Sequence, residues 1–284
     1  MIDTDLERRF GGLARLYGVS GAARIRTAHI VVVGLGGVGS WAAEALARSG
    51  VARLTLIDLD HIAESNINRQ VHALDTTLGQ SKVQAMRERI AHINPVCQVD
   101  CIEEFVDAEN WPGLVSFDLQ PAGGNMAFID ACDQVKAKTA LAAWALKNQA
   151  CFISVGAAGG KRLAHQVEID DLSAVTHDPL LAQIRSRLRK DQQATRTGKM
   201  NVMCVFSHEP ITKPSAAQGA AELSNIVVND SLSTLMPTQS DGSLNCHGYG
   251  SAVPLTSTFG MCAAGWILNK IADDSEKQLK NVII

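Results

Sequence analysis

A strand of buried character that stops abruptly in glycines constrains the fold more than any other segment. Residues 30–33 are Ile-Val-Val-Val, four β-branched residues with no polar interruption, as in a central parallel strand covered on both faces. Gly34, Gly36 and Gly39 follow with the spacing G-x-G-x-x-G, which permits a tight turn and close approach of a phosphate to the backbone. The pattern predicts a nucleotide-binding strand, turn and helix; the alternative is a tight turn that binds no ligand.

A helix is expected to begin near Val38, directly after this loop. The unpaired N–H groups and the positive dipole end of its first turn would face the loop, where they favour a phosphate. Its apolar stripe runs from Val38 to Leu46, whereas Glu44 and Arg48 lie one turn apart on the other side. The loop residues expected to contact the nucleotide are Gly34, Gly36, Gly37, Val38 and Gly39.

A second apolar segment, residues 54–57, ends in Asp58. This aspartate lies about 20 residues beyond the loop, where a carboxylate can accept hydrogen bonds from ribose hydroxyls. A dehydrogenase that uses a nicotinamide cofactor fits this much of the pattern equally well. The cations that follow favour ATP, because the guanidinium fork of Arg69 and the point charge of Lys82 suit the β- and γ-phosphates of a triphosphate.

Together these features resemble the ThiF-type adenylating family, which includes ubiquitin-activating enzymes and their bacterial relatives in molybdopterin and thiamine synthesis. The shared motifs are the glycine loop, the D-x-D of Asp58 and Asp60, the S-N-x-x-R-Q that contains Asn66 and Arg69, and the G-x-x-K that ends at Lys82. The resemblance implies that the cofactors are ATP and Mg²⁺ and that these residues join the glycine loop in binding the nucleotide.

Asp133 is the candidate magnesium ligand. It ends the strand-like segment 127–133, and carboxyl ends of parallel strands share one crevice, so it should lie near Asp58. A carboxylate there can hold the ion that neutralises a triphosphate, and Asp133 matches the metal-binding aspartate of the family's D-x-x-D. The alternative role is an N-cap for a helix at residues 134–148. Asp130 is one β-period out of phase and should face the core or cap a helix.

Residues 3–26 are predicted to form an N-terminal helical arm. Within it, residues 9–18 read R-F-G-G-L-A-R-L-Y-G, which resembles one branch of the family, the tRNA threonylcarbamoyladenosine dehydratases. The resemblance implies a homodimer in which an arginine of the arm reaches the partner's triphosphate. Gly12 replaces the second arginine of the usual R-x-x-R, so Arg15 is the candidate; an arginine that is merely solvated is the alternative.

The same resemblance implies a substrate, tRNA carrying threonylcarbamoyladenosine near the anticodon. Its threonyl carboxylate would attack the α-phosphate of ATP and release pyrophosphate, and its carbamoyl group would then close a ring and expel AMP. Arg69, Lys82 and the magnesium held by Asp133 would stabilise charge on the phosphates, which makes these three the candidate catalytic residues.

Two other functions stay open. One is adenylation of the C-terminal carboxylate of a ubiquitin-like or sulfur-carrier protein, and the other is a non-catalytic nucleotide-sensing scaffold. The presence of Arg69, Lys82 and Asp133 together disfavours the scaffold, because a sensor does not need such a complete set. A cysteine-desulfurase or sulfur-acceptor partner and a bound monovalent cation are also left open.

A basic segment is the candidate tRNA contact. The net charge of the whole chain is -3, so a concentration of cations marks an electrostatic footprint for a polyanion. A solvated helix face is the alternative. The residues concerned are Arg185, Arg189 and Lys190 on a helix predicted at 180–190, and Arg196 and Lys199 in the loop that follows.

The chain has seven cysteines and no C-x-x-C pair, which argues against a tetracysteine zinc site and a secreted disulfide framework. We therefore expect no zinc and a cytoplasmic location. Cys246 is a possible thioester-forming thiol beside His247; a small buried hydrophobe is the alternative. Residues 252–271 are apolar but interrupted, so we expect a buried helix and no membrane span. The last helix should start within residues 253–260.

The predicted fold class is α/β, a Rossmann-like, doubly wound and mostly parallel sheet extended by a mixed C-terminal half. A strand within residues 96–106 is acidic and should lie at an edge of the sheet. We expect one domain over residues 1–284. Its parts would be the arm at 1–27, an ATP-binding half at 28–155, and a half at 156–284 for tRNA binding and dimerisation.

Overall fold

The computed structural model describes residues 5–115, 126–191, 194–212 and 249–280, with side chains as far as residue 273. In this part of the chain one seven-stranded sheet has the order β3-β2-β1-β4-β5-β7-β6. The strands are β1 (His29–Val33), β2 (Arg53–Ile57), β3 (Gln98–Ile102), β4 (Met126–Asp130), β5 (Cys151–Val155), β6 (Val167–Asp171) and β7 (Met203–Ser207). The helices are α1 (Leu6–Phe10), α2 (Gly12–Arg26), α3 (Gly39–Arg48), α4 (Lys82–Ile93), α5 (Val135–Asn148), α6 (Pro179–Asp191) and α8 (Val253–Lys280).

The order of the strands confirms the predicted fold class. Neighbouring strands are parallel from β3 through to β7, and β6 alone is antiparallel, to β7. Successive strands are added toward one edge of the sheet from β1 to β3 and toward the other edge from β4 onward, so the switch point of this doubly wound sheet lies between β1 and β4. The acidic strand β3 lies at one edge, as predicted. The division at residues 27 and 155 stays a prediction.

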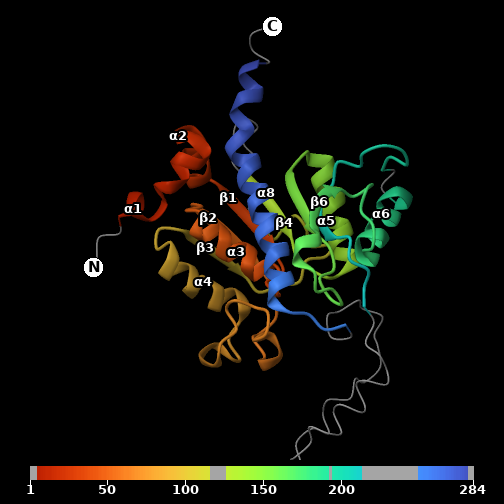
Figure 1. Ribbon diagram of the computed structural model, residues 1–284, viewed down its shortest axis with the longest axis horizontal. Helices are drawn as coiled ribbons and strands as arrows, with labels where there is room; N and C mark the ends of the chain where they lie inside the picture. Colours follow the sequence, from red (N-terminus) through yellow and green to blue (C-terminus); the bar gives the residue numbers. More distant parts are fainter. Residues whose placement is uncertain (1–4, 116–125, 192–193, 213–248, 281–284) are drawn as a thin grey trace, which may run out of the picture.

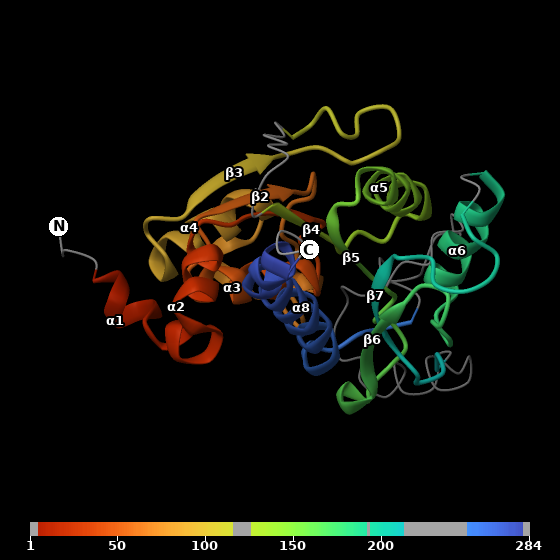
Figure 2. The ribbon, with the colours of Figure 1, turned by 90° about the horizontal axis from the view of Figure 1, so that it is seen from above.

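Two cores follow from the alternation of side chains along β1. Ile30 and Val32 face one core, together with α3, α4 and α8, while Val31 and Val33 face the other, together with α5 and α6. Figure 2 shows α8 and α5 on opposite sides of the strands. Because both faces are covered, an uninterrupted β-branched run is stable in β1.

Helix α8 runs across the middle of one face of the sheet (Figure 1). The last helix starts within residues 253–260, as predicted, because α8 begins at Val253. Pro254 lies in its first turn, where the missing N–H has no intrahelical partner to lose. Gly260 lies against α3: a Cβ there would be 2.4 Å from the carbonyl oxygen of Val38. Within the described residues, no helix has the length and apolarity needed to cross a membrane.

The N-terminal arm is helical as predicted, but it is divided. Gly11 separates α1 from α2, and Gly18 interrupts α2 with a φ of 71°. The guanidinium of Arg24 donates to the carbonyl oxygens of Ile271 and Ala272, so the arm is fastened to α8.

One expectation about an exposed charge was wrong. Glu44 was placed on the side of α3 away from the apolar stripe, but it is 2% exposed and accepts hydrogen bonds from Arg48 and Arg89. Lys82, at the start of α4, is buried as well: it is 6% exposed and pairs with Asp60. Periodicity assigns faces by polarity alone, and it does not detect a partner that makes a charge tolerable inside.

A buried ion pair anchors the carboxyl end of β4. Asp130 is fully buried, 3.0 Å from the ammonium of Lys138 on α5, which is buried as well. The hydroxyl of Ser154 donates to the same carboxylate at 2.7 Å. Asp130 therefore faces the core, as one of its two predicted roles requires, and it ties β4 to α5 and β5.

We predict that Lys138→Met lowers the free energy of unfolding by about 3–5 kcal/mol, because it leaves the Asp130 carboxylate buried without a counter-ion. The control is Lys147→Met on the exposed side of the same helix, for which we expect a change within about 0.5 kcal/mol. Urea unfolding measures both. Equal effects of the two substitutions would show that the ion pair does not stabilise this strand end.

Candidate active site

A cavity of about 470 Å³ lies at the carboxyl ends of the central strands. Its walls are the glycine loop after β1, the residues that follow β2, β4 and β5, the 3-10 helix η1 (Glu64–Asn66), and the start of α8. This is the crevice in which open α/β sheets bind ligands. Every predicted ligand of the nucleotide from Gly34 to Asp133 lines it, except Gly39.

The glycines of the loop have different physical roles. Gly34 adopts a φ of 86°, and a Cβ there would be 2.8 Å from the backbone nitrogen of Cys132. A Cβ on Gly39 would lie 1.8 Å from the carbonyl oxygen of Gly34. A Cβ on Gly36 would meet no atom within 4 Å, although this residue lines the cavity. Gly34 and Gly39 thus make the turn possible, and Gly36 leaves room for a ligand.

Asp58 joins the loop to the second strand. Its Oδ2 accepts the backbone N–H of Leu35 at 2.6 Å, and its Oδ1 accepts that of Asp60 at 2.9 Å. Burial raises the pKa of Asp58 above its usual value, although Lys82 and these backbone groups act in the opposite direction. Each oxygen retains a free lone pair, so the carboxylate can still accept from ribose hydroxyls, the role predicted for it.

Lys82 begins α4 and is aimed into the cavity between two carboxylates. Its ammonium is 2.7 Å from Asp60 Oδ2 and 3.8 Å from Asp58 Oδ1. An ammonium has three donors, and only the hydrogen bond to Asp60 falls within bonding distance in the described structure. The pair therefore holds Lys82 in place while it keeps donors for an anionic ligand.

Arg69 and Asn66 are positioned by the turn that follows β2. The Arg69 guanidinium donates to the carbonyl oxygen of Ser65 at 2.5 Å and to Asn68 Oδ1 at 2.9 Å, both through Nη1. The indole N–H of Trp41, on α3, donates to the Arg69 carbonyl oxygen at 2.9 Å. Asn66 is buried and accepts the N–H of Ala63, so it shapes the turn.

Asp133 is a carboxylate in this cavity that suits a metal ion. It is exposed, lies just beyond β4, and makes no hydrogen bond or ion pair with any residue that the structure describes. It does not cap α5, whose N-cap is Gln134, so the alternative role was wrong. Among the described residues no three His, Cys, Asp or Glu side chains form a ready-made metal site. One free carboxylate fits Mg²⁺, which takes most of its other ligands from water and phosphate.

The residues predicted for contacts across a dimer and with tRNA do not line this cavity. Arg15 is exposed on α2 and does not line the cavity of its own chain. The basic segment lies on and after α6, at the opposite end of the sheet from α1 (Figure 2). Within it, Arg185 donates to the carbonyl oxygens of Leu172 and Val175, which gives it a structural role. Cys246 lies outside the described residues.

The structure adds cavity residues that the sequence did not reveal. Thr256 comes from the first turn of α8, and a Cβ on Gly37 would lie 3.3 Å from its Cβ. Phe105 follows the edge strand β3 and is 49% exposed, which is unusual for phenylalanine and offers an apolar face to a ligand. Long-range packing brings Thr256 here, and no local pattern in the sequence signals it.

We predict that Gly36→Ala keeps the melting temperature within about 2 °C, because the new methyl group meets no protein atom. The same methyl group should weaken ATP binding about tenfold or more, as the loss of a charge-assisted hydrogen bond would. Calorimetric titration with ATP measures this. Gly39→Ala is the contrasting variant and should fail to fold stably. Normal ATP affinity in Gly36→Ala would show that the phosphates do not lie against the loop.

Comparison with known proteins agrees with this geometry. Residues 10–284 match the family model described as the ThiF family. The chain is 40% identical over 268 residues to a tRNA threonylcarbamoyladenosine dehydratase of Haemophilus influenzae, covering 93% of this chain and 94% of the relative.

Solved structures of the Escherichia coli tRNA N6-threonylcarbamoyladenosine dehydratase, TcdA, are also similar. The complex with ATP superposes with a TM-score of 0.78 at 36% identity, covering 98% of this chain and all of that one. The complex with AMP gives a TM-score of 0.78 at 37% identity, covering 98% and 99% of the two chains. The chain therefore belongs to the ThiF family, in the branch of the tRNA threonylcarbamoyladenosine dehydratases.

Proposed function

We propose that the protein uses ATP to cyclise threonylcarbamoyladenosine in tRNA, with loss of water, through a carboxyl adenylate. One observation carries the proposal: the glycine loop, Asp58, Arg69, Lys82 and Asp133 line a single cavity. In addition, relatives that match nearly the whole chain are named as dehydratases of this nucleoside, and one was solved with ATP. The residues of the cavity support ATP binding, and the names of the relatives support the identity of the substrate.

The reaction divides into two displacements. The threonyl carboxylate attacks the α-phosphate of ATP, and pyrophosphate leaves. The carbamoyl group of the same nucleoside then attacks the activated acyl carbon, which closes the ring and expels AMP. Because the nucleophile of the second step is part of the substrate, no enzyme thiol is required, and Cys246 is not assigned a role.

Arg69 and Lys82 would bind and stabilise the phosphates during the first step. Negative charge accumulates on the departing pyrophosphate, and fixed cations at that position lower the barrier because they need no reorganisation. Lys82 is held by Asp60 and Asp58, and Trp41 fixes the backbone of Arg69. Both cations are therefore oriented before the nucleotide arrives.

Asp133 would hold Mg²⁺. When bound, the ion neutralises charge on the phosphates and acts as a Lewis acid at their oxygens. The free carboxylate of Asp133 supports this assignment, whereas Asp130 is committed to Lys138 and Asp58 to the backbone.

The test of the substrate is AMP formation. We expect AMP when the protein and ATP are incubated with tRNA that carries threonylcarbamoyladenosine, and none with a tRNA that lacks this group. Activation of a carrier protein is not favoured, since the relatives that match over the full length are dehydratases. AMP formed with a ubiquitin-like carrier and not with tRNA would overturn the proposal.

We predict that Asp133→Asn folds normally but lowers the rate of AMP formation about a hundredfold or more, because it removes a charge that stabilises the transition state. Asp273→Asn, an exposed aspartate on α8, is the matched control and should retain full activity. Melting curves verify folding. A near-normal rate in folded Asp133→Asn would remove this residue from the mechanism.

We also propose that the exposed cations on and after α6 contact the tRNA backbone. Lys190, Arg196 and Lys199 are exposed, whereas Arg189 is half-buried and donates to the carbonyl oxygen of Thr195. Phosphate contacts position a nucleic acid without specifying its sequence, so a concentrated basic segment suits this role.

Replacing Lys190, Arg196 and Lys199 by alanine should weaken tRNA binding and flatten its salt dependence by roughly one unit of slope per lost contact. ATP affinity should not change. The control removes three exposed lysines elsewhere, Lys136, Lys147 and Lys270. Filter binding at several salt concentrations measures the slopes, and equal slopes in both triple variants would place the tRNA elsewhere.

A homodimer and a cytoplasmic location complete the proposal. Leu16 and Val19 are 74% and 80% exposed on α2, beside Arg15, and such apolar side chains suit a subunit interface. A cytoplasmic location fits a tRNA substrate, and the H. influenzae relative is a bacterial protein named for a tRNA modification. Sedimentation as a monomer at micromolar concentration would rule out the dimer and any role of Arg15 in a partner's site.

A further inference from the structure

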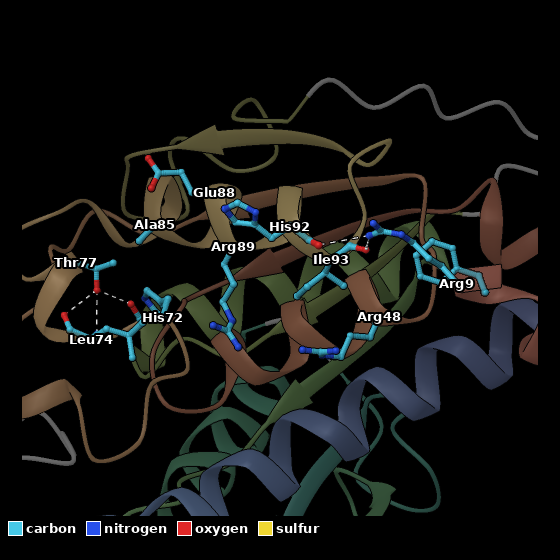
Figure 3. A pocket seen from close by; sticks show the side chains of 11 residues that line it. Arg9, Arg48, His72, Leu74, Thr77, Ala85, Glu88, Arg89, His92 and Ile93 are labelled. Atoms are coloured by element: carbon cyan, nitrogen blue, oxygen red, sulfur yellow. Dashed lines mark hydrogen bonds between the residues drawn. The ribbon is translucent and has the colours of Figure 1, made fainter. Parts of the chain in front are cut away.

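A second cavity, of about 670 Å³, lies along α4 beyond the nucleotide cavity (Figure 3). One wall is α4. The others are α1, the C-terminal end of α3, and residues 72–77, which follow η1. Lys82 at the start of α4 lines the nucleotide cavity, and Ala85, one turn later, lines the second cavity. The charged and histidine side chains that line the second cavity are Arg9, Arg48, His72, Glu88, Arg89 and His92.

Cations outnumber anions around this cavity. Glu44 is buried beneath it and accepts from Arg48 Nε at 2.8 Å and from Arg89 Nε at 2.7 Å, so two guanidinium groups share one carboxylate. Arg89 Nη2 also donates to Glu44, at 3.1 Å. Figure 3 shows Arg89 and Arg48 converging below α4. Within the described residues, both Nη groups of Arg48 and Nη1 of Arg89 have no hydrogen-bond partner, and they remain as oriented donors.

The charges at the two ends do not cancel this excess. Arg9 donates to the carbonyl oxygens of Ile93, at 2.7 Å, and His92, at 3.4 Å, and it closes one end of the cavity at the C-terminus of α4. Glu88 accepts a hydrogen bond from Gln80 at 2.9 Å, and Figure 3 shows its carboxylate turned away from Arg48. An anion that enters between Arg9 and Arg89 would therefore meet guanidinium groups first.

His72 is the second, independent observation. It is 2% exposed, lines the cavity, and neither of its ring nitrogens has a hydrogen-bond partner among the residues that the structure describes. Burial, with the nearby charges of Lys82 and Arg89, lowers its pKa to about 4, so the imidazole is neutral at pH 7 and offers one N–H donor. Buried polar groups without partners are rare in folded proteins and call for a ligand or a water molecule.

We propose that the second cavity is a phosphate site and that a backbone phosphate of tRNA occupies it. The tRNA part of this inference rests on the proposed function. Guanidinium forks match the geometry of phosphate oxygens, and the N–H of a neutral imidazole can donate to the same group.

The position of the cavity favours a polynucleotide over a small anion. Arg9, Glu88 and His92 on its rim are exposed, so the site is open to an extended ligand. One short segment forms a wall of both cavities, since Gln70 lines the nucleotide cavity and His72 the second one. An RNA whose modified base reaches the ATP would thus bring a neighbouring part of its backbone past Arg48 and His72.

The test compares three variants in tRNA binding at several salt concentrations. Arg48→Gln removes unpaired donors and leaves Glu44 paired with Arg89, and we expect the salt slope to fall by roughly one unit. Arg87→Gln is the control: Arg87 is exposed on α4, which forms one wall of the cavity, but it does not line the cavity itself and its loss should leave the wild-type slope unchanged. Equal slopes in Arg48→Gln and Arg87→Gln would overturn the proposal.

His72→Phe separates binding from stability. A phenyl ring of similar shape removes two unpaired buried nitrogens, so the melting temperature should stay equal or rise. Affinity for tRNA should nevertheless fall roughly tenfold, the effect of one hydrogen bond to a charged group. A lower melting temperature with unchanged tRNA affinity would mean that His72 is only a packing residue.

Inorganic phosphate, added with ATP saturating the first cavity, distinguishes the occupants. We expect phosphate to raise the melting temperature of the wild type and of Arg87→Gln more than that of Arg48→Gln. Arg48→Gln could reduce the rise in melting temperature with phosphate and yet leave the salt slope of tRNA binding unchanged. In that case the occupant is a small phosphate, and the assignment to tRNA is wrong. Failure of the proposed function is recognised separately, because AMP would then not form with modified tRNA even in the wild type.

Discussion

The contact between Gly39 and the carbonyl oxygen of Gly34 is the constraint on which the rest of the site depends. A Cβ on Gly39 would lie 1.8 Å from that oxygen, so α3 can start this close to β1 only without a side chain there. The close start places the positive dipole end of α3 directly behind Gly36, Gly37 and Val38, which line the cavity. Gly260 lets α8 pack against the same turn, and Thr256 thereby reaches the nucleotide site.

Ion pairs recur at several places in the structure, and each holds a cation in position. Ion pairs with at least one buried partner hold cations in fixed orientations: Asp130 holds Lys138, Asp60 holds Lys82, and Glu44 holds Arg48 and Arg89. Fixed cations are effective ligands for phosphates, since the free energy of orienting them is supplied during folding. The pair of Asp130 and Lys138 differs, because it is fully enclosed and serves the fold.

The sequence predicted the sheet, the glycine turn and the convergence of Asp58 and Asp133, since these follow from alternation, glycine spacing and the shared edge of parallel strands. It did not predict that Glu44 is buried or that Thr256 lines the cavity. Both depend on contacts between segments far apart in the chain, and periodicity contains no information about such partners.

The central claim is that the cavity directs a substrate carboxylate onto the α-phosphate of ATP. The most direct measurement uses tRNA whose threonyl carboxylate is labelled with heavy oxygen, followed by mass spectrometry of the nucleotide products. Attack on the α-phosphate and later expulsion of AMP would transfer one labelled oxygen to AMP and none to pyrophosphate. Unlabelled AMP, or label in inorganic phosphate together with ADP, would contradict the account.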